Sequence, residues 1–268
     1  MKFQLAPAAL VLGGLMAAGA AQAQDATAEG IAKYREMLQD GNPAELFEMK
    51  GEELWKQKRG PKNVSLEKCD LGKGPGVIEG VFVELPRFFK DTGRVQDLES
   101  RLVTCMETLQ GFNGAEIAKT RFGRDEMANV TALATYVATA SKGMKFNLPQ
   151  THAAERAMYE TGKRLFFTRG GTHDFSCASC HGESDKRIRL QDLPNLTKNP
   201  GDGIGFAAWP AYRVSNSQMW GMQLRLNDCF RQMRWPEPKF GSDATIALST
   251  YMGVNAKSAE SIVPAIKR

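Results

Sequence analysis

The sequence contains an internal repeat, and the repeat constrains the fold because both halves must then adopt one type of structure. Leu85-Pro86 is followed nineteen residues after the proline by Cys105, and Trp209-Pro210 is followed at the same offset by Cys229. The other matches are collinear with this one: Arg101-Leu102 with Arg225-Leu226, residues 131–136 with 245–251, and residues 51–55 with 162–166. We therefore predict two tandem domains of one type.

The spacing of apolar residues predicts a mainly α-helical fold in both halves. The domain boundary is expected between Gly143 and Gln150, which gives domains of residues 24–147 and 148–268. Residues 77–85 alternate weakly and predict a short strand or an extended segment. The candidate helices are residues 52–58, 95–110, 125–141, 152–167, 216–233 and 242–253.

A c-type haem attachment motif identifies the kind of domain. Cys177 and Cys180 are followed directly by His181, so two thiols three residues apart can reach both vinyl groups of one haem. The adjacent histidine then reaches the iron as an axial ligand. A redox Cys-x-x-Cys site and a zinc site are the alternatives, but the βαβ pattern and the further ligands that they need are missing. We predict one covalently attached haem c and a cytochrome c-like fold.

The repeat also predicts what the first domain has lost. Where the second half has Cys177-x-x-Cys180-His181, the first has Cys69 followed by Asp70-Leu71-Gly72-Lys73. The first domain is therefore expected to be a cytochrome fold without haem. Cys69 and Cys105 would face each other across the lost site and form a disulfide in an oxidising compartment, although two free buried thiols are the alternative.

The N-terminus predicts the compartment. Residues 1–23 read as a secretory signal peptide, with Lys2, an apolar run and an Ala21-Gln22-Ala23 cleavage site. No later stretch is long and apolar enough to span a membrane. The formal net charge of +5 is diffuse and forms no basic stripe, which argues against nucleic acid as a partner. Export together with haem attachment indicates the bacterial periplasm.

The sequence does not decide the second axial ligand of the iron, for which methionine and cysteine are the main candidates. Four methionines are plausible by position, and each is equally explained by core packing. His152 and His173 are expected to be surface or loop residues. Cys229 is the other candidate, because its counterpart Cys105 points at the lost haem position in the first domain. The four methionines are Met219, Met222, Met233 and Met252.

Cys229 is the cysteine that neither the haem motif nor the disulfide uses. Arg225 precedes it by four residues on a predicted helix, so the two side chains share one face. A guanidinium beside a thiol favours the thiolate and offers a forked donor to an oxyanion. Thiolate, arginine and haem together suit the oxidative formation of a sulfur–sulfur bond, whereas a solvated arginine and a structural thiol are the alternative.

These residues resemble those of the SoxA family, the haem c subunits of the SoxAX cytochrome complex of thiosulfate oxidation. The resemblance rests on the duplicated domains, the haem motif and Arg225-x-x-x-Cys229. It implies that Cys229 is both the distal haem ligand and the catalytic residue, as thiolate or persulfide, and that Arg225 binds substrate. Members with a haem in each domain differ from this sequence at Gly72 and Lys73, so it resembles the single-haem type.

The resemblance also implies a reaction and partners. Thiosulfate would join the sulfur at Cys229 and pass to a cysteine of the carrier protein SoxYZ, which is L-cysteine S-thiosulfotransferase activity. The haem c protein SoxX would form a heterodimer with this chain, and a small c-type cytochrome would accept the electrons. The competing functions are a periplasmic electron carrier with His/Met ligation and a haem-containing sensor or binding subunit.

Overall fold

The computed structural model describes residues 29–30, 33–34, 36–37, 41–188, 191–197 and 204–267. The chain divides into two compact units, residues 1–42 and 43–268, and the account below concerns the second unit. The expected signal peptide, residues 1–23, lies outside the described residues.

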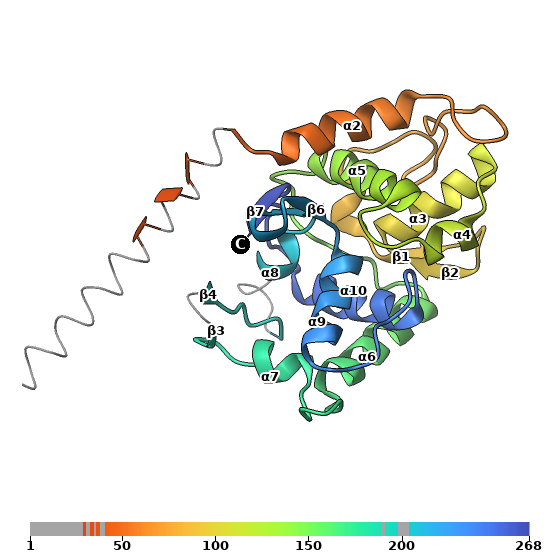
Figure 1. Ribbon diagram of the computed structural model, residues 1–268. Helices are drawn as coiled ribbons and strands as arrows, with labels where there is room; N and C mark the ends of the chain where they lie inside the picture. The colour runs from red at the N-terminus through yellow and green to blue at the C-terminus, as the bar shows by residue number, and fades with distance from the viewer. Residues whose placement is uncertain are drawn as a thin grey trace, which may run out of the picture. The chain divides into compact units, whose positions relative to one another are not determined.

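The second unit is mainly helical, as predicted, with short strands in three small sheets (Figure 1). Its first half contains α2 (Ala44–Lys56), η1 (Phe82–Glu84), β1 (Arg87–Phe89), β2 (Arg94–Gln96), α3 (Leu98–Cys105), η2 (Met106–Gln110), α4 (Gly114–Lys119) and α5 (Asp125–Thr139). Its second half contains α6 (Ala153–Phe167), α7 (Cys177–His181), β3 (Arg187–Ile188), β4 (Gln191–Asp192), α8 (Ile204–Ala207), β5 (Ala211–Arg213), η3 (Val214–Asn216), β6 (Gln218–Trp220), α9 (Met222–Gln232), α10 (Asp243–Asn255) and β7 (Ala265–Lys267).

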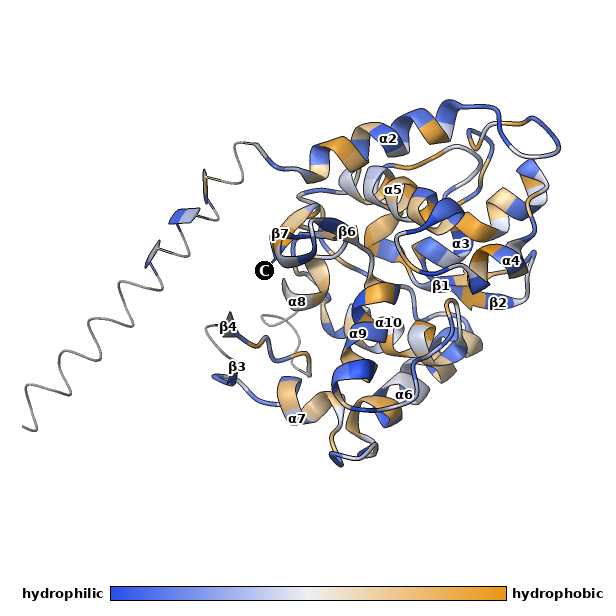
Figure 2. Ribbon diagram, viewed as in Figure 1, coloured by the Kyte–Doolittle hydropathy of each residue, from blue (hydrophilic) through white to orange (hydrophobic). Residues whose placement is uncertain are grey.

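Each half is built on a pair of packed helices, α2 on α5 and α6 on α10. Helix α2 alternates hydrophilic and hydrophobic residues, which suits a helix with one buried side (Figure 2). Glycine allows both close approaches: a Cβ at Gly51 would collide with the carbonyl oxygen of Ala132, and one at Gly162 with that of Ala247. These four residues occupy matching places in the repeat.

A two-stranded hairpin precedes the cysteine-bearing helix in both halves. Strands β1 and β2 pair antiparallel before α3, and β5 and β6 pair antiparallel before α9, with β7 added in parallel along β5. The predicted helices 95–110 and 216–233 were therefore wrong at their starts. Asp97 begins α3 by accepting the Ser100 N–H, and the residues before it pair as a strand instead.

The predicted strand at residues 77–85 is also wrong. This segment forms turns and the 3-10 helix η1, with hydrogen bonds between residues three apart, such as Glu84 N–H to the Val81 carbonyl. Gly76 and Gly80 adopt positive φ, which interrupts an extended chain at two points. The predicted helices at 125–141, 152–167 and 242–253 are confirmed by α5, α6 and α10.

The loop before the haem motif corrects the alignment of the two halves. Gly60 and Gly171 both have positive φ (69° and 68°), and each loop is closed by an antiparallel bridge, Arg59 to Val64 and Gly170 to Phe175. Counting on from these glycines, Cys69 falls opposite Cys180 and not opposite Cys177 as expected. The first half has therefore lost the first thiol of the motif and its histidine, which are replaced by Leu66 and Asp70.

The expected disulfide is confirmed: Cys69 and Cys105 are bonded, with their Cα atoms 5.6 Å apart. Beside it, Arg101 is fully engaged within its own domain. Its guanidinium donates to Asp91 at 2.8 Å and to the Asp70 carbonyl at 2.7 Å, and it lies 4.0 Å from the centre of the Phe89 ring. With only 6% of its side chain exposed, Arg101 is a structural residue.

Removing the disulfide should destabilise the protein without removing the haem. We expect Cys69→Ala with Cys105→Ala to lower the free energy of unfolding by about 3 kcal/mol, because the bond closes a loop across a sequence separation of 36 residues. Thermal unfolding followed by circular dichroism measures the change. Reductant should lower the melting temperature of the native protein to that of the variant; equal melting temperatures of native protein and variant without reductant would contradict this role.

Candidate haem c site

The haem attachment motif forms its own short helix, α7. Ser176 begins the helix by accepting the N–H of Ser179, whose side-chain hydroxyl accepts the Ser176 N–H in return. The two motif cysteines and the histidine all remain partly exposed. The helix thus keeps both thiols and the imidazole partly accessible, with Cys177 packed against the edge of the core.

His181 is oriented by a backbone contact. Its Nδ1 lies 2.8 Å from the Pro194 carbonyl oxygen, and its own carbonyl accepts the N–H of Leu196. An Nδ1–H donated to a carbonyl places the lone pair of the ring on Nε2, which is the arrangement of a metal-ligating histidine. Burial lowers the pKa of His181, and the positive charge of Arg225 lowers it further, which favours the neutral imidazole that a metal needs.

Cys229 lies on α9 close to the motif. Cys180 acts electrostatically on Cys229, Cys229 acts on Cys177, and Arg225 acts on both Cys229 and His181, so these side chains lie near one another. Two opposing effects act on the ionisation of Cys229. Burial raises the pKa of the Cys229 thiol, and this outweighs the opposing effect of Arg225. The arginine alone does not ionise the thiol, whereas a metal ion does when the sulfur ligates it.

The donor set therefore fits haem c. Burial also raises the pKa of Cys177 to about 12, so this sulfur suits a thioether bond better than a thiolate role. Cys177 and Cys180 would hold the haem covalently, with His181 as one axial ligand and Cys229 as the candidate for the other. The group would supply an electron acceptor beside the Cys229 sulfur.

The other predicted ligands are placed elsewhere or stay untested. His152 is exposed, begins α6 by accepting the Ala154 N–H, and stacks on Phe88 at 3.7 Å. His173 is exposed in the loop before α7. Both are surface residues, as expected. Met219, Met233 and Met252 are buried core residues and Met222 packs on the core, as the packing alternative describes.

Asp228 is a site residue that the sequence did not single out. Its carboxylate, 8% exposed, accepts from Arg225 at 3.0 Å and from Gln232 at 2.7 Å, and it also pairs with Arg231. These contacts hold the Arg225 guanidinium beside Cys229 on the same helix. The same guanidinium lies 5.7 Å from the centre of the Trp209 ring. Arg225 is thus positioned from two sides while its side chain stays 23% exposed.

The N-terminus of α9 is held by an acid from the other half of the unit. Glu99 accepts the N–H of Gln223 at 3.0 Å and also that of Met222, which satisfies donors that a helix start leaves free. Gly221 permits the approach, because a Cβ there would collide with the Glu99 carboxyl. The Gln223 side chain donates to Asp97 at 2.6 Å. The starts of the equivalent helices α3 and α9 are therefore tied together.

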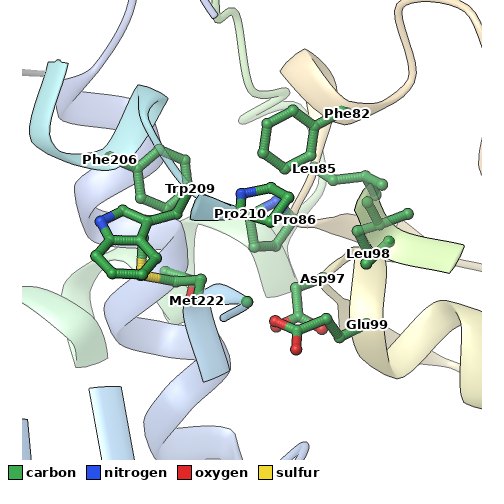
Figure 3. A pocket seen from close by; sticks show the side chains of 13 residues that line it. Phe82, Leu85, Pro86, Asp97, Leu98, Glu99, Phe206, Trp209, Pro210 and Met222 are labelled. Atoms are coloured by element: carbon green, nitrogen blue, oxygen red, sulfur yellow. The ribbon is translucent and has the colours of Figure 1, made fainter. Parts of the chain in front are cut away.

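The two acids line a small cavity of about 30 Å³, which has room for a water molecule. Figure 3 shows Asp97 and Glu99 close together below Pro86 and Pro210, with Trp209 and Met222 opposite. Burial, reinforced by the charge of Asp97, raises the pKa of Glu99 to about 8. Burial raises the pKa of Asp97 as well.

Fold and site together define a c-type cytochrome. Comparison with known proteins agrees: residues 50–146 match the family described as SoxA/TsdA, cytochrome c domain. The L-cysteine S-thiosulfotransferase subunit SoxA of Hydrogenophilus thermoluteolus is 54% identical over 90% of this chain and 88% of that protein. A subunit of the same name from Hydrogenobacter thermophilus is 34% identical over 91% of each chain. The chain belongs to the SoxA family of L-cysteine S-thiosulfotransferase subunits.

A solved structure agrees on the fold. The crystal structure of SoxXA from P. pantotrophus contains a chain that superimposes with a TM-score of 0.73, over 88% of this chain and 84% of that one, at 24% sequence identity. Within the part of the chain that the structure describes, none of the helices has the length and apolar character needed to cross a membrane.

The buried acid Glu99 should make stability fall as the pH rises. Its pKa is about 8 in the folded protein and near 4.5 when unfolded, so unfolding releases a proton between these values. With Glu99 present, the free energy of unfolding should fall by at most about 1.4 kcal/mol per pH unit over that range. We expect this fall to be absent in Glu99→Gln, which keeps an acceptor for the N–H groups of α9.

Melting temperatures of both proteins from pH 5 to pH 8.5 measure this difference. Asp243→Asn is the matched control, because its carboxylate is exposed and pairs only at the surface with Arg94. If the melting temperatures of the native protein and of Glu99→Gln changed with pH in parallel, the claim that Glu99 is buried and neutral in the folded protein would be contradicted.

Proposed function

We propose that this chain is a single-haem, catalytic SoxA that joins thiosulfate oxidatively to a cysteine of the carrier protein SoxYZ. The observation that carries the proposal is the placement of Cys229 and Arg225 on one face of α9, close to the haem attachment helix. Cys229 would carry the sulfur, and Cys229 and His181 would both be ligands of the haem iron. Arg225 binds the sulfonate end of the substrate.

The proposal includes two tandem cytochrome c-like domains, residues 24–147 and 148–268, of which the second holds the haem. The matching helix pairs, hairpins and glycines of the two halves support this division. The family match to residues 50–146 supports a cytochrome origin for the half that has no Cys-x-x-Cys-His. The disulfide at Cys69 and Cys105 then takes the place of the first haem.

The chemistry proceeds in two steps. In the first, the outer sulfur of thiosulfate bonds to the sulfur of Cys229, the thiol proton leaves and two electrons are removed. In the second, a thiolate of SoxYZ attacks the outer sulfur, takes the –S–SO₃⁻ group and releases Cys229 as thiolate. Arg225 holds the sulfonate oxygens with a forked set of N–H donors while the sulfur atoms meet.

The electrons need acceptors beyond this chain. A haem c held by Cys177, Cys180 and His181 would supply a one-electron acceptor, so the two electrons would leave one at a time to a small c-type cytochrome. The SoxX haem c subunit forms a heterodimer with this chain in the proposed assembly. The predicted signal peptide and covalent haem attachment support a reaction in the periplasm.

Replacing Cys229 tests the sulfur-carrying role. We expect Cys229→Ala to lower turnover of thiosulfate with SoxYZ by at least about 100-fold, because the covalent intermediate cannot form. Cys229→Met is the matched variant: it offers the iron a thioether, so haem content and low-spin ligation should be kept while turnover is still lost. Full turnover by either variant would end the catalytic assignment and favour an electron carrier.

Replacing Arg225 tests substrate binding. We expect Arg225→Ala to raise the KM for thiosulfate about 10- to 100-fold with covalent haem content unchanged, because a charge-assisted contact to the sulfonate is removed. Arg231→Ala is the control, because it also removes a partner of Asp228 but lies further along α9 with its side chain 58% exposed. An equal rise in KM for the two variants would mean that the loss of an ion pair with Asp228, and not the loss of a substrate contact, causes the change.

A further inference from the structure

Arg213 is a second arginine at the site, contributed by the last position of β5. Its guanidinium lies 4.9 Å from the centre of the Trp220 ring on the neighbouring strand β6. Its Nε is buried and has no hydrogen-bond partner, and none of the carboxylates in the described ranges forms an ion pair with it. A buried donor without a partner is costly, so this group is suited to an anion that is not part of the chain.

The charged groups that act on Arg213 belong to the proposed catalytic helix. Arg225, Asp228 and Cys229 all affect it, and Arg213 in turn acts on Cys229. The one carboxylate among them, Asp228, already receives Arg225, Arg231 and Gln232. The negative charge of Asp228 is therefore shared and does not neutralise both Arg213 and Arg225. Two positive charges close together in a partly buried place favour the binding of an anion from solution.

The repeat supplies an internal comparison. Counting along the matching hairpins, Phe89 in the half without the motif occupies the place of Arg213. There the ring of Phe89 supports Arg101, whose guanidinium is satisfied by Asp91 and a backbone carbonyl. The second arginine is therefore present in the half that carries Cys-x-x-Cys-His and absent from its twin. Packing alone does not require a charge at this position.

We infer that Arg213 is a second anion-binding residue, and that together with Arg225 it makes the site prefer doubly charged sulfur oxyanions to singly charged anions. The inference rests on the proposed function for its substrate, thiosulfate, which carries two negative charges. Each guanidinium is held against an indole, Arg225 at Trp209 and Arg213 at Trp220, so both donors are oriented before the anion arrives.

The test uses the haem-loaded heterodimer with Arg213→Gln. We expect the KM for thiosulfate to rise about 10- to 100-fold with a smaller change in kcat, because the contact is made in the bound state as well as in the transition state. Arg213→Lys should recover part of the affinity. Arg94→Gln, at an exposed arginine whose side chain is 60% accessible, is the matched control and should leave KM unchanged.

Inhibition separates binding from chemistry. Sulfate, an unreactive dianion, should inhibit the native complex competitively, and its inhibition constant should rise in Arg213→Gln by the same factor as KM. The inhibition constant of nitrate, a monoanion, should change by less than about 3-fold. Equal factors for sulfate and nitrate would overturn the charge preference, and an unchanged KM for thiosulfate would overturn the binding role.

Two further measurements keep the inference independent of folding and of the proposed reaction. Arg213→Phe introduces the side chain that the first half has at this place, so the variant should keep its haem content and melting temperature but lose sulfate affinity. If sulfate binding weakened only together with a lower melting temperature, Arg213 would have a structural role. Calorimetric titration with sulfate needs no turnover. The native complex could bind sulfate but fail to convert thiosulfate. If Arg213→Gln then lost sulfate binding, the anion site would stand and only the proposed function would be refuted.

Discussion

The direction of helix α9 is the constraint on which the site depends. One end of this helix is held by Glu99 from the first half of the unit, at a glycine that leaves no room for a side chain. Further along, the same helix presents Arg225 and Cys229 to the haem attachment helix. A rigid helix transmits the position of its start to every side chain on it, so a contact from the half without the attachment motif positions the side chains of the proposed site in the other half.

The two halves show how one scaffold is used for two purposes. In the first, a disulfide, an arginine bound to Asp91 and a phenylalanine lie together, and the guanidinium of that arginine has its partners within the chain. In the second, the equivalent arginine is shared with Asp228 and stays partly exposed, and a second arginine replaces the phenylalanine. The first half contributes stability and a helix cap, whereas the second, in the proposed function, keeps unsatisfied charge for a ligand.

Local patterns explain what could be predicted from the sequence. The haem motif, the long helices, the Cys69–Cys105 bond and the common face of Arg225 and Cys229 follow from spacing within a few residues or from the repeat. The short strands β2 and β6 were missed, because an apolar run before a helix cap reads as more helix. Glu99 could not be found, because its partner Gln223 lies far along the chain. Arg213 could not be found, because its place beside Trp220 depends on the pairing of β5 with β6, which the sequence did not predict.

The central claim is that Cys229 is the iron ligand opposite His181 at one haem. The electronic absorption spectrum of the ferric heterodimer, compared with that of the Cys229→Met variant, tests it most directly. The account predicts that the charge-transfer band of a thioether ligand from this chain is absent from the native protein and appears in the variant. Identical ferric spectra for the native heterodimer and the Cys229→Met variant would contradict the claim, because the iron of this chain would then have another ligand.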